Sequence, residues 1–100
     1  NLGQKLIPDK FAMHQNYPNP FNPVTTIQYD MPFGSDILIR IYDIQGRIVK
    51  TILSGYQAAG RRSIVWDATN DIGESVSAGM YLYLIESHDF QQTRKMLLLK

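Results

Sequence analysis

The chain has no cysteine among its 100 residues, and this absence leaves its compartment open. A domain without disulfides fits a reducing cytosol, and it equally fits an exported bacterial domain that is stable without them. No apolar run approaches the roughly 18–20 residues that span a bilayer, so we expect no direct membrane insertion. No charged-then-apolar leader follows Asn1. We therefore expect a segment of a longer protein whose export signal, if there is one, lies upstream.

Strong charge and catalytic motifs are also missing. The net charge is +1, whereas nucleic-acid binding usually requires a marked basic face, so we expect no nucleic-acid partner. The two histidines, His14 and His88, lie in no recognisable nucleophile setting. Neither a phosphate-binding glycine loop nor a Gly-x-Ser-x-Gly elbow occurs. The sequence therefore predicts a protein that is not an enzyme and that needs no cofactor.

No segment keeps a 3.6-residue period, and the pattern that is present alternates every second residue. Such alternation with β-branched and aromatic residues is typical of half-buried strands. It marks strands at 24–31, 36–43, 47–53, 61–67, 80–87 and 93–99. A seventh strand near 11–14 and a short one near 74–77 are weaker predictions. Turn-forming residues separate these segments, which predicts an all-β Greek-key sandwich of about seven antiparallel strands, with a small closed barrel as the alternative.

Residues 16–23 read Asn-Tyr-Pro-Asn-Pro-Phe-Asn-Pro and hold three of the five prolines. Proline fixes its own φ and disfavours helix at the preceding residue, so this proline segment should be extended. Tyr17 and Phe21 give it aromatic side chains to bury, unlike an ordinary linker. We interpret it as a boundary between a lead-in at 1–15 and a folded domain at 16–100.

One loop carries candidate metal ligands. Asp67, Asn70, Asp71 and Glu74 offer oxygen atoms in and beside the loop at 68–78, and oxygen is what calcium prefers. The spacing does not match an EF-hand. Short Asn and Asp side chains also form turns by bonding to nearby backbone, and we favour that interpretation over a calcium site.

Aromatic residues on the predicted strands allow two interpretations. Trp66, Tyr42, Tyr81 and Tyr83 could form a sugar-stacking platform, with Tyr81 and Tyr83 as an exposed pair. Large aromatics more often anchor a sandwich core, however, and Trp66 shares a face with Ile64. We favour the core interpretation for Trp66.

The last segment is apolar with basic flanks, and no acid follows Asp89. Residues 93–100 could be an ordinary edge strand guarded by lysines. They could equally be a tag that another protein recognises by strand addition. The residues alone leave these two interpretations even.

A family resemblance favours the tag. The proline segment, the run at 41–46, Ala59-Gly60, Trp66-Asp67, the run at 77–81 and the ending at 93–100 come in the order seen in type A C-terminal sorting domains of the type IX secretion system of Bacteroidetes. The chain also resembles the immunoglobulin-like domain of the flagellar hook-capping protein. Ala68 is a departure, because many members have glycine there.

The resemblance implies an immunoglobulin-like β-sandwich that directs an upstream passenger through the type IX outer-membrane translocon. The passenger would cross the periplasm of a Gram-negative bacterium and be released or attached at the cell surface. A sortase-like peptidase would cut in the lead-in. The implied recognition residues match the family's Gly-x-Tyr and terminal motifs and the segment between them: Gly79, Tyr81, Arg94, Lys95, Leu97, Leu98, Leu99 and Lys100. The alternative is an immunoglobulin-like structural, adhesion or carbohydrate-binding module of a surface protein.

Overall fold

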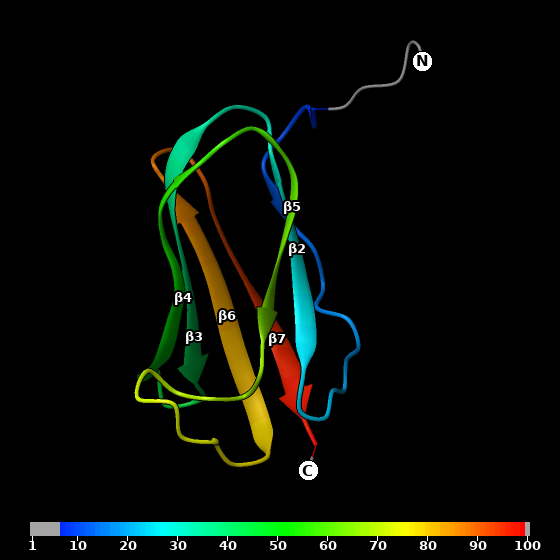
Figure 1. Cartoon of the computed structure of the whole chain (residues 1–100), viewed down its shortest axis with the longest axis vertical. Helices are drawn as coiled ribbons and strands as arrows, with labels where there is room; N and C mark the ends of the chain where they lie inside the picture. Colours follow the sequence, from blue (N-terminus) through cyan, green and yellow to red (C-terminus); the bar gives the residue numbers. More distant parts are fainter. Residues whose placement is uncertain (1–6, 100) are drawn as a thin grey trace.

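The protein is a two-sheet sandwich in the computed structural model, which describes residues 7–99. Its strands are β1 (Ala12–Met13), β2 (Thr25–Met31), β3 (Ser35–Asp43), β4 (Ile48–Gln57), β5 (Gly60–Trp66), β6 (Gly79–Ser87) and β7 (Gln91–Leu98). One sheet has the order β1-β2-β5 and the other β4-β3-β6-β7, and all pairs are antiparallel. Figure 1 shows the two sheets face to face. The predicted sandwich is confirmed, and the sheets do not close into a barrel.

Strand alternation explains the core. In β3, Ile37, Ile39 and Ile41 are buried while the residues between them are partly exposed, as the sequence predicts. β2 buries Ile27 and Tyr29 in the same way. Successive side chains of a strand point to opposite faces, so each strand gives one row to the core. Fully burying a side chain of this size contributes about 1.5–3 kcal/mol.

Aromatic residues close the end of the core near the chain's C-terminus. Trp66 is 1% exposed, and its ring centroid lies 5.8 Å from that of Phe21 and 5.4 Å from that of Tyr81. The Trp66 Nε1–H donates to the Thr69 carbonyl at 2.9 Å. Trp66 is thus a core anchor, as predicted, and the proline segment contributes Phe21 to the same cluster.

A tight turn joins β3 to β4, with main-chain bonds from the Gly46 amide to the Asp43 carbonyl and from the Asp43 amide to the Arg47 carbonyl, both at 3.0 Å. Gly46 has φ +83°, which a residue with a Cβ rarely adopts. Asp43 Oδ1 accepts hydrogen bonds from the Gln45 and Arg47 amides at 2.9 and 3.0 Å. The Arg47 Nε–H donates to Asp43 Oδ2 at 2.9 Å. The bond from the Arg47 amide is the main reason why the pKa of Asp43 is lowered.

Two weaker predictions have different outcomes. A strand does form within 11–14, because β1 pairs with β2 and buries Met13 completely. The folded unit therefore begins before residue 16, while the idea of an upstream passenger stays a prediction. The prediction of a short strand near 74–77 is wrong, since that region forms only a single bridge between Thr69 and Ser75.

In the described residues, no helix has the length and apolar character to cross a membrane.

Candidate functional site

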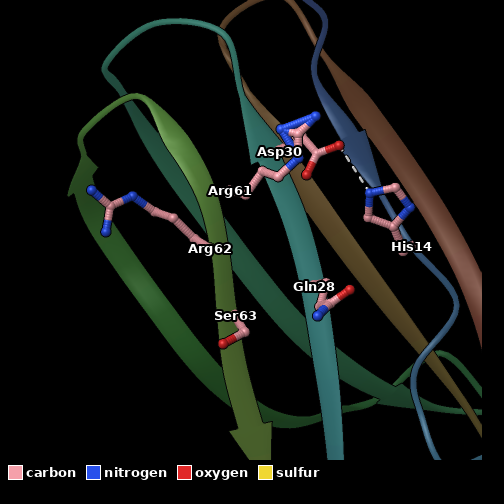
Figure 2. Close-up of a pocket in the computed structure, with 6 residues that line it drawn as sticks. All are labelled: His14, Gln28, Asp30, Arg61, Arg62 and Ser63. Atoms are coloured by element: carbon pink, nitrogen blue, oxygen red, sulfur yellow. Dashed lines mark hydrogen bonds and ion pairs between the residues drawn. The ribbon is translucent and has the colours of Figure 1, made fainter. Parts of the chain in front are cut away.

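A polar depression lies on the outer face of the β1-β2-β5 sheet (Figure 2). It has a volume of about 200 Å³ and is lined by His14, Gln28, Asp30, Arg61, Arg62 and Ser63. His14 Nε2 lies 2.9 Å from Asp30 Oδ2. Ser63 lies on β5, across the sheet from His14, so the depression does not pair a nucleophile with this imidazole.

The loop at 68–78 uses its oxygen-bearing side chains locally. Asn70 Oδ1 accepts from the Ile72 and Glu74 amides at 3.1 and 2.9 Å. Asp67 Oδ1 accepts from the Thr69 hydroxyl at 2.6 Å, which lowers the pKa of Asp67.

Another calcium candidate, Asp71, accepts through Oδ1 from the Thr51 amide of β4 at 3.1 Å. Among the described residues, no group of three or more His, Cys, Asp or Glu is placed to hold a metal ion. Asp67, Asn70 and Asp71 therefore bond to neighbouring groups of the loop and of β4, and Glu74 Oε1 accepts from Asn70 Nδ2 at 3.4 Å.

The sugar-platform residues are not together on the surface. Trp66, Tyr81 and Tyr83 are 1%, 7% and 0% exposed. Tyr81 and Tyr83 belong to the inward row of β6, so the prediction of an exposed tyrosine pair is wrong. A sugar ring cannot stack on buried rings, so these three residues do not form the sugar-stacking platform, and Tyr42 is only half-buried.

The two family motifs lie side by side in one hairpin. Gly79 pairs with Leu98, and Tyr81 pairs with Met96, across β6 and β7. The sequence placed these motifs on the last two strands, and this pairing confirms that they are adjacent. Met80 lies between Gly79 and Tyr81 in the outward row of β6, opposite Leu97 in the outward row of β7. The outward row of β6 continues beyond Tyr81.

The Tyr81 side chain has a structural role in the fold. Its hydroxyl donates to the Ser77 carbonyl at 2.6 Å, four residues upstream. This back-bonding near the start of the sixth strand is the tyrosine corner known from immunoglobulin-like sandwiches. Burial raises the pKa of Tyr81, and the Asp43 carboxylate raises it further. Gly79, with φ +145°, begins the strand in a conformation that favours glycine.

Only some of the predicted recognition residues are available to a partner. Leu98 is fully buried, like Tyr81, whereas Lys95 and Leu99 are exposed and Leu97 is half-buried. Lys100 lies outside the described residues. Sequence reasoning missed Met80, which is 42% exposed and lies opposite Leu97. The alternating pattern does not mark it, because both rows of β6 are apolar.

Part of the proline segment covers the outer edge of β7. Asn19 Oδ1 accepts from the Leu97 amide at 3.0 Å. The Phe21 amide donates to the Leu97 carbonyl at 3.0 Å, and the Leu99 amide donates to the Phe21 carbonyl at 2.8 Å. We call residues 12–21, which continue along this edge, the edge segment.

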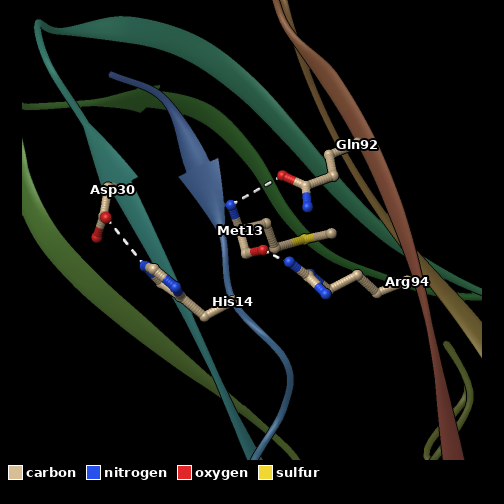
Figure 3. Close-up of polar contacts among 5 residues, drawn as sticks. All are labelled: Met13, His14, Asp30, Gln92 and Arg94. Carbon is tan, nitrogen blue, oxygen red and sulfur yellow. Dashed lines mark hydrogen bonds and ion pairs between the residues drawn. The ribbon is translucent and has the colours of Figure 1, made fainter. Parts of the chain in front are cut away.

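Side chains of β7 hold the other half of the edge segment (Figure 3). The Met13 amide donates to Gln92 Oε1 at 3.1 Å, and the Arg94 Nε–H donates to the Met13 carbonyl at 2.7 Å. Gln15 Nε2 donates to the Lys95 carbonyl at 2.7 Å. Arg94 therefore has a structural partner within the domain.

Tyr83 secures the edge segment from inside the core. Its hydroxyl donates to the His14 carbonyl at 3.0 Å and accepts from the Asn16 amide at 2.7 Å. Burial raises the pKa of Tyr83, and the bond from Asn16 partly opposes this rise.

Together these bonds occupy the β7 edge beside Lys95, Leu97 and Leu99. Strand addition needs unpaired backbone groups along an edge. The edge segment already uses the Lys95 carbonyl, the Leu97 amide and carbonyl and the Leu99 amide, so this part of the β7 edge is closed to strand addition in the folded domain.

The fold places the protein in the class of immunoglobulin-like β-sandwiches, with a tyrosine corner on its sixth strand. The sequence model of the FlgD Ig-like domain matches residues 24–89, more than half of the chain. The chain therefore belongs to the FlgD Ig-like domain family. A search of the curated proteins found no match.

Three solved structures have a similar fold. Dimeric latent PorU from Porphyromonas gingivalis aligns with a TM-score of 0.69 and 23% identity over 90% of this chain. PorZ from Porphyromonas gingivalis, an essential bacterial surface component of the type IX secretion system, aligns with a TM-score of 0.59 and 18% identity over 92%. FlgD from P. aeruginosa aligns with a TM-score of 0.58 and 20% identity over 94%.

These likenesses concern the fold, since the identities are low. The chain spans 9% of PorU and 12% of PorZ, so it is similar to one part of each of these larger proteins. It spans 74% of the FlgD chain.

Proposed function

We propose that this domain is a non-enzymatic C-terminal sorting module of type IX secretion. It directs an upstream passenger across the outer membrane through the translocon, for release or attachment at the cell surface. A sortase-like peptidase of the system then removes the domain. The module needs no cofactor, because its role is to be recognised by proteins.

The β6–β7 register carries this proposal. It places the Gly79–Tyr81 motif beside the terminal motif in one hairpin, with Gly79 opposite Leu98 and Met80 opposite Leu97. The similarity of fold to PorZ, a surface component of the type IX system, supports the same assignment.

A reporter fusion tests the proposal. A reporter carrying an N-terminal export signal is joined to residues 1–100 in a type IX-competent host, and its surface fraction is measured. We expect the reporter at the surface in this host and in the periplasm when the translocon is disabled. Deleting Lys95–Lys100 should also leave it in the periplasm, and normal secretion of that deletion would refute the proposal.

The FlgD family match favours a second candidate, a structural module that stays in the mature protein. The two candidates differ in the fate of the domain. Intact-mass measurement of the surface form shows loss of residues 16–100 if the domain is a removed sorting module, and their retention if it is a structural module.

A further inference from the structure

The two outer faces of the sandwich differ in chemistry. On the β1-β2-β5 sheet, the outward residues of β2 are Thr26, Gln28 and Asp30, all polar. On the β4-β3-β6-β7 sheet, the outward residues of β6 include Met80, Leu82 and Leu84. A solvated sheet face is normally polar, so the apolar row of β6 needs an explanation.

Strand pairing makes this row part of a continuous patch. Tyr42 on β3 lies opposite Leu82. Leu97 on β7 lies opposite Met80. We call Tyr42, Met80, Leu82, Leu84 and Leu97 the apolar face. Leu82, Leu84, Leu97 and Tyr42 are half-buried, and Met80 is 42% exposed.

The charged residues that lie opposite members of the apolar face are basic. Lys95 lies opposite Leu82, and Arg40 lies opposite Leu84. Arg40 is held in place by its Nε–H, which donates to Thr51 Oγ1 at 3.0 Å. The first acid on β6 in this row, Glu86, comes one position beyond Leu84 on the outer face. Positive charge from Lys95 and Arg40 therefore lies beside the apolar face.

We infer that the apolar face is the surface through which a partner protein docks on this domain. The partner's complementary surface is apolar, with carboxylates opposite Lys95 and Arg40, because unlike charges at an interface steer association and fix its register. This inference rests on the proposed function and names the recognition surface that sorting would use. The closed β7 edge supports it, since main-chain pairing there is already satisfied.

A second copy of the chain fits this surface poorly. In a two-fold contact the same patch meets itself. Two copies centred on Leu82 would bring both Lys95 and both Arg40 side chains into one interface, and the described rows of Leu82 and Leu84 carry no acid. Like charges brought together in this way oppose self-association.

An anionic bilayer fits less well than a protein surface. Membrane-bound surfaces insert apolar side chains into the headgroup and acyl boundary. Leu82, Leu84 and Leu97 lie half-buried in a sheet face and do not project as such anchors. A half-buried apolar surface with charged residues beside it matches the core and rim of a protein–protein interface.

Two face variants and one matched control test the inference in the reporter fusion. Leu82→Glu places a negative charge at the centre of the apolar face, and Lys95→Glu reverses an exposed charge without touching the core. Val65→Glu is the control, because Val65 is 57% exposed on the outward row of β5 in the other sheet. Thermal melts of the three domains establish that each is folded.

We expect both face variants to reduce the surface fraction by roughly tenfold, the effect of losing about 1.4 kcal/mol of docking free energy. Val65→Glu should secrete like wild type. If folded face variants secrete normally while the Lys95–Lys100 deletion is retained, the inference fails and the proposed function stands. If the deletion itself secretes normally, the proposed function fails first.

Two further measurements separate the other occupants. Sedimentation that shows a dimer of residues 1–100, lost in Leu82→Glu, would overturn the inference in favour of a second copy. Flotation with phosphatidylglycerol vesicles, lost in both face variants, would overturn it in favour of a membrane. A photo-crosslinking residue at position 82, but not at 65, should give an adduct with a protein other than this chain.

Discussion

Single buried hydroxyl groups connect distant parts of this chain. The Tyr83 hydroxyl contacts the His14 carbonyl and the Asn16 amide, which are 69 and 67 residues away in sequence. Tyr83 is fully buried, so water cannot replace these bonds when the hydroxyl is removed. At the residue scale, the attachment of the edge segment to the core therefore depends strongly on the Tyr83 side chain.

Tyr83→Phe should lower the free energy of unfolding by about 1–3 kcal/mol, because it leaves a buried donor and a buried acceptor unpaired. Urea denaturation measures the change. Tyr42→Phe, on the outer face, is the control and should change stability by less than about 0.5 kcal/mol. Equal effects of the two substitutions would contradict this account of Tyr83.

Asp43 should make stability depend on acid pH. Its pKa is lowered in the fold, chiefly by the hydrogen bond from the Arg47 amide. A lowered carboxyl pKa contributes stability above its unfolded value, here 3.8, and this contribution is lost as pH falls through the folded pKa. Asp43→Asn should therefore destabilise the domain at pH 6 more than at pH 2.5, measured by urea denaturation at both pH values.

Arg47→Gln is the matched variant for this experiment. It removes the guanidinium and keeps the main-chain amide, so the pH dependence should fall only in part. An Asp43→Asn effect that is the same at both pH values would show that the charge of Asp43 is not involved.

At the scale of elements, the edge segment is the unusual one. It pairs with β2 through β1, while its contacts to β7 combine side-chain bonds with a short stretch of main-chain pairing around Phe21. Because it covers the backbone groups of β7, it also protects an apolar strand from pairing with other chains.

Asn19→Ala should expose the Leu97 amide. We expect a loss of about 0.5–1.5 kcal/mol in the free energy of unfolding and faster hydrogen exchange at Leu97. Asn22→Ala is the control, since Asn22 is an exposed residue of the same type in the proline segment, just beyond the edge segment. Unchanged exchange at Leu97 would mean that the Asn19 contact does not protect this edge.

Local patterns predicted the strands but not the edge segment. The alternation of Ile37, Ile39 and Ile41 shows directly which face is buried. In β6 both rows are apolar, so alternation could not tell that Tyr81 and Tyr83 face inward. The bonds from Gln92 and Arg94 to Met13 join residues 79 and 81 positions apart, and no local pattern marks such pairs.

The candidate site was predictable to a similar extent. The sequence placed the two motifs on the last two strands, because each lies in a clear alternating run. It could not show that Leu98 and Arg94 are committed to the fold while Met80 is exposed. That distinction depends on the register of β6 against β7 and on the position of the other sheet.

At the scale of the whole molecule, the fold predicts where the domain can be shortened. Removing residues 1–10 leaves β1 intact and should lower the melting temperature less than a deletion that reaches into β1. Removing residues 1–15 takes away Met13, which is fully buried. Losing such a side chain costs about 2–5 kcal/mol, and 1 kcal/mol corresponds to about 4–8 °C in a domain of this size, so the melting temperature should fall by about 10 °C or more.

Calorimetry of the two truncated domains checks this prediction. Similar melting temperatures for both would place the start of the folded unit after residue 15, against the position of β1 in the sheet.

The bonds between the edge segment and β7 also bear on folding during synthesis. The partners of Met13 and Asn19 lie 78 to 81 residues later, so the ribosome makes them last. Long-range contacts of this kind raise the contact order and delay completion of the fold. A chain cut short before β7 leaves β1 without its bonds to Gln92 and Arg94 and cannot complete the sandwich. Correct closure of this edge thus reports that translation has reached the final strand.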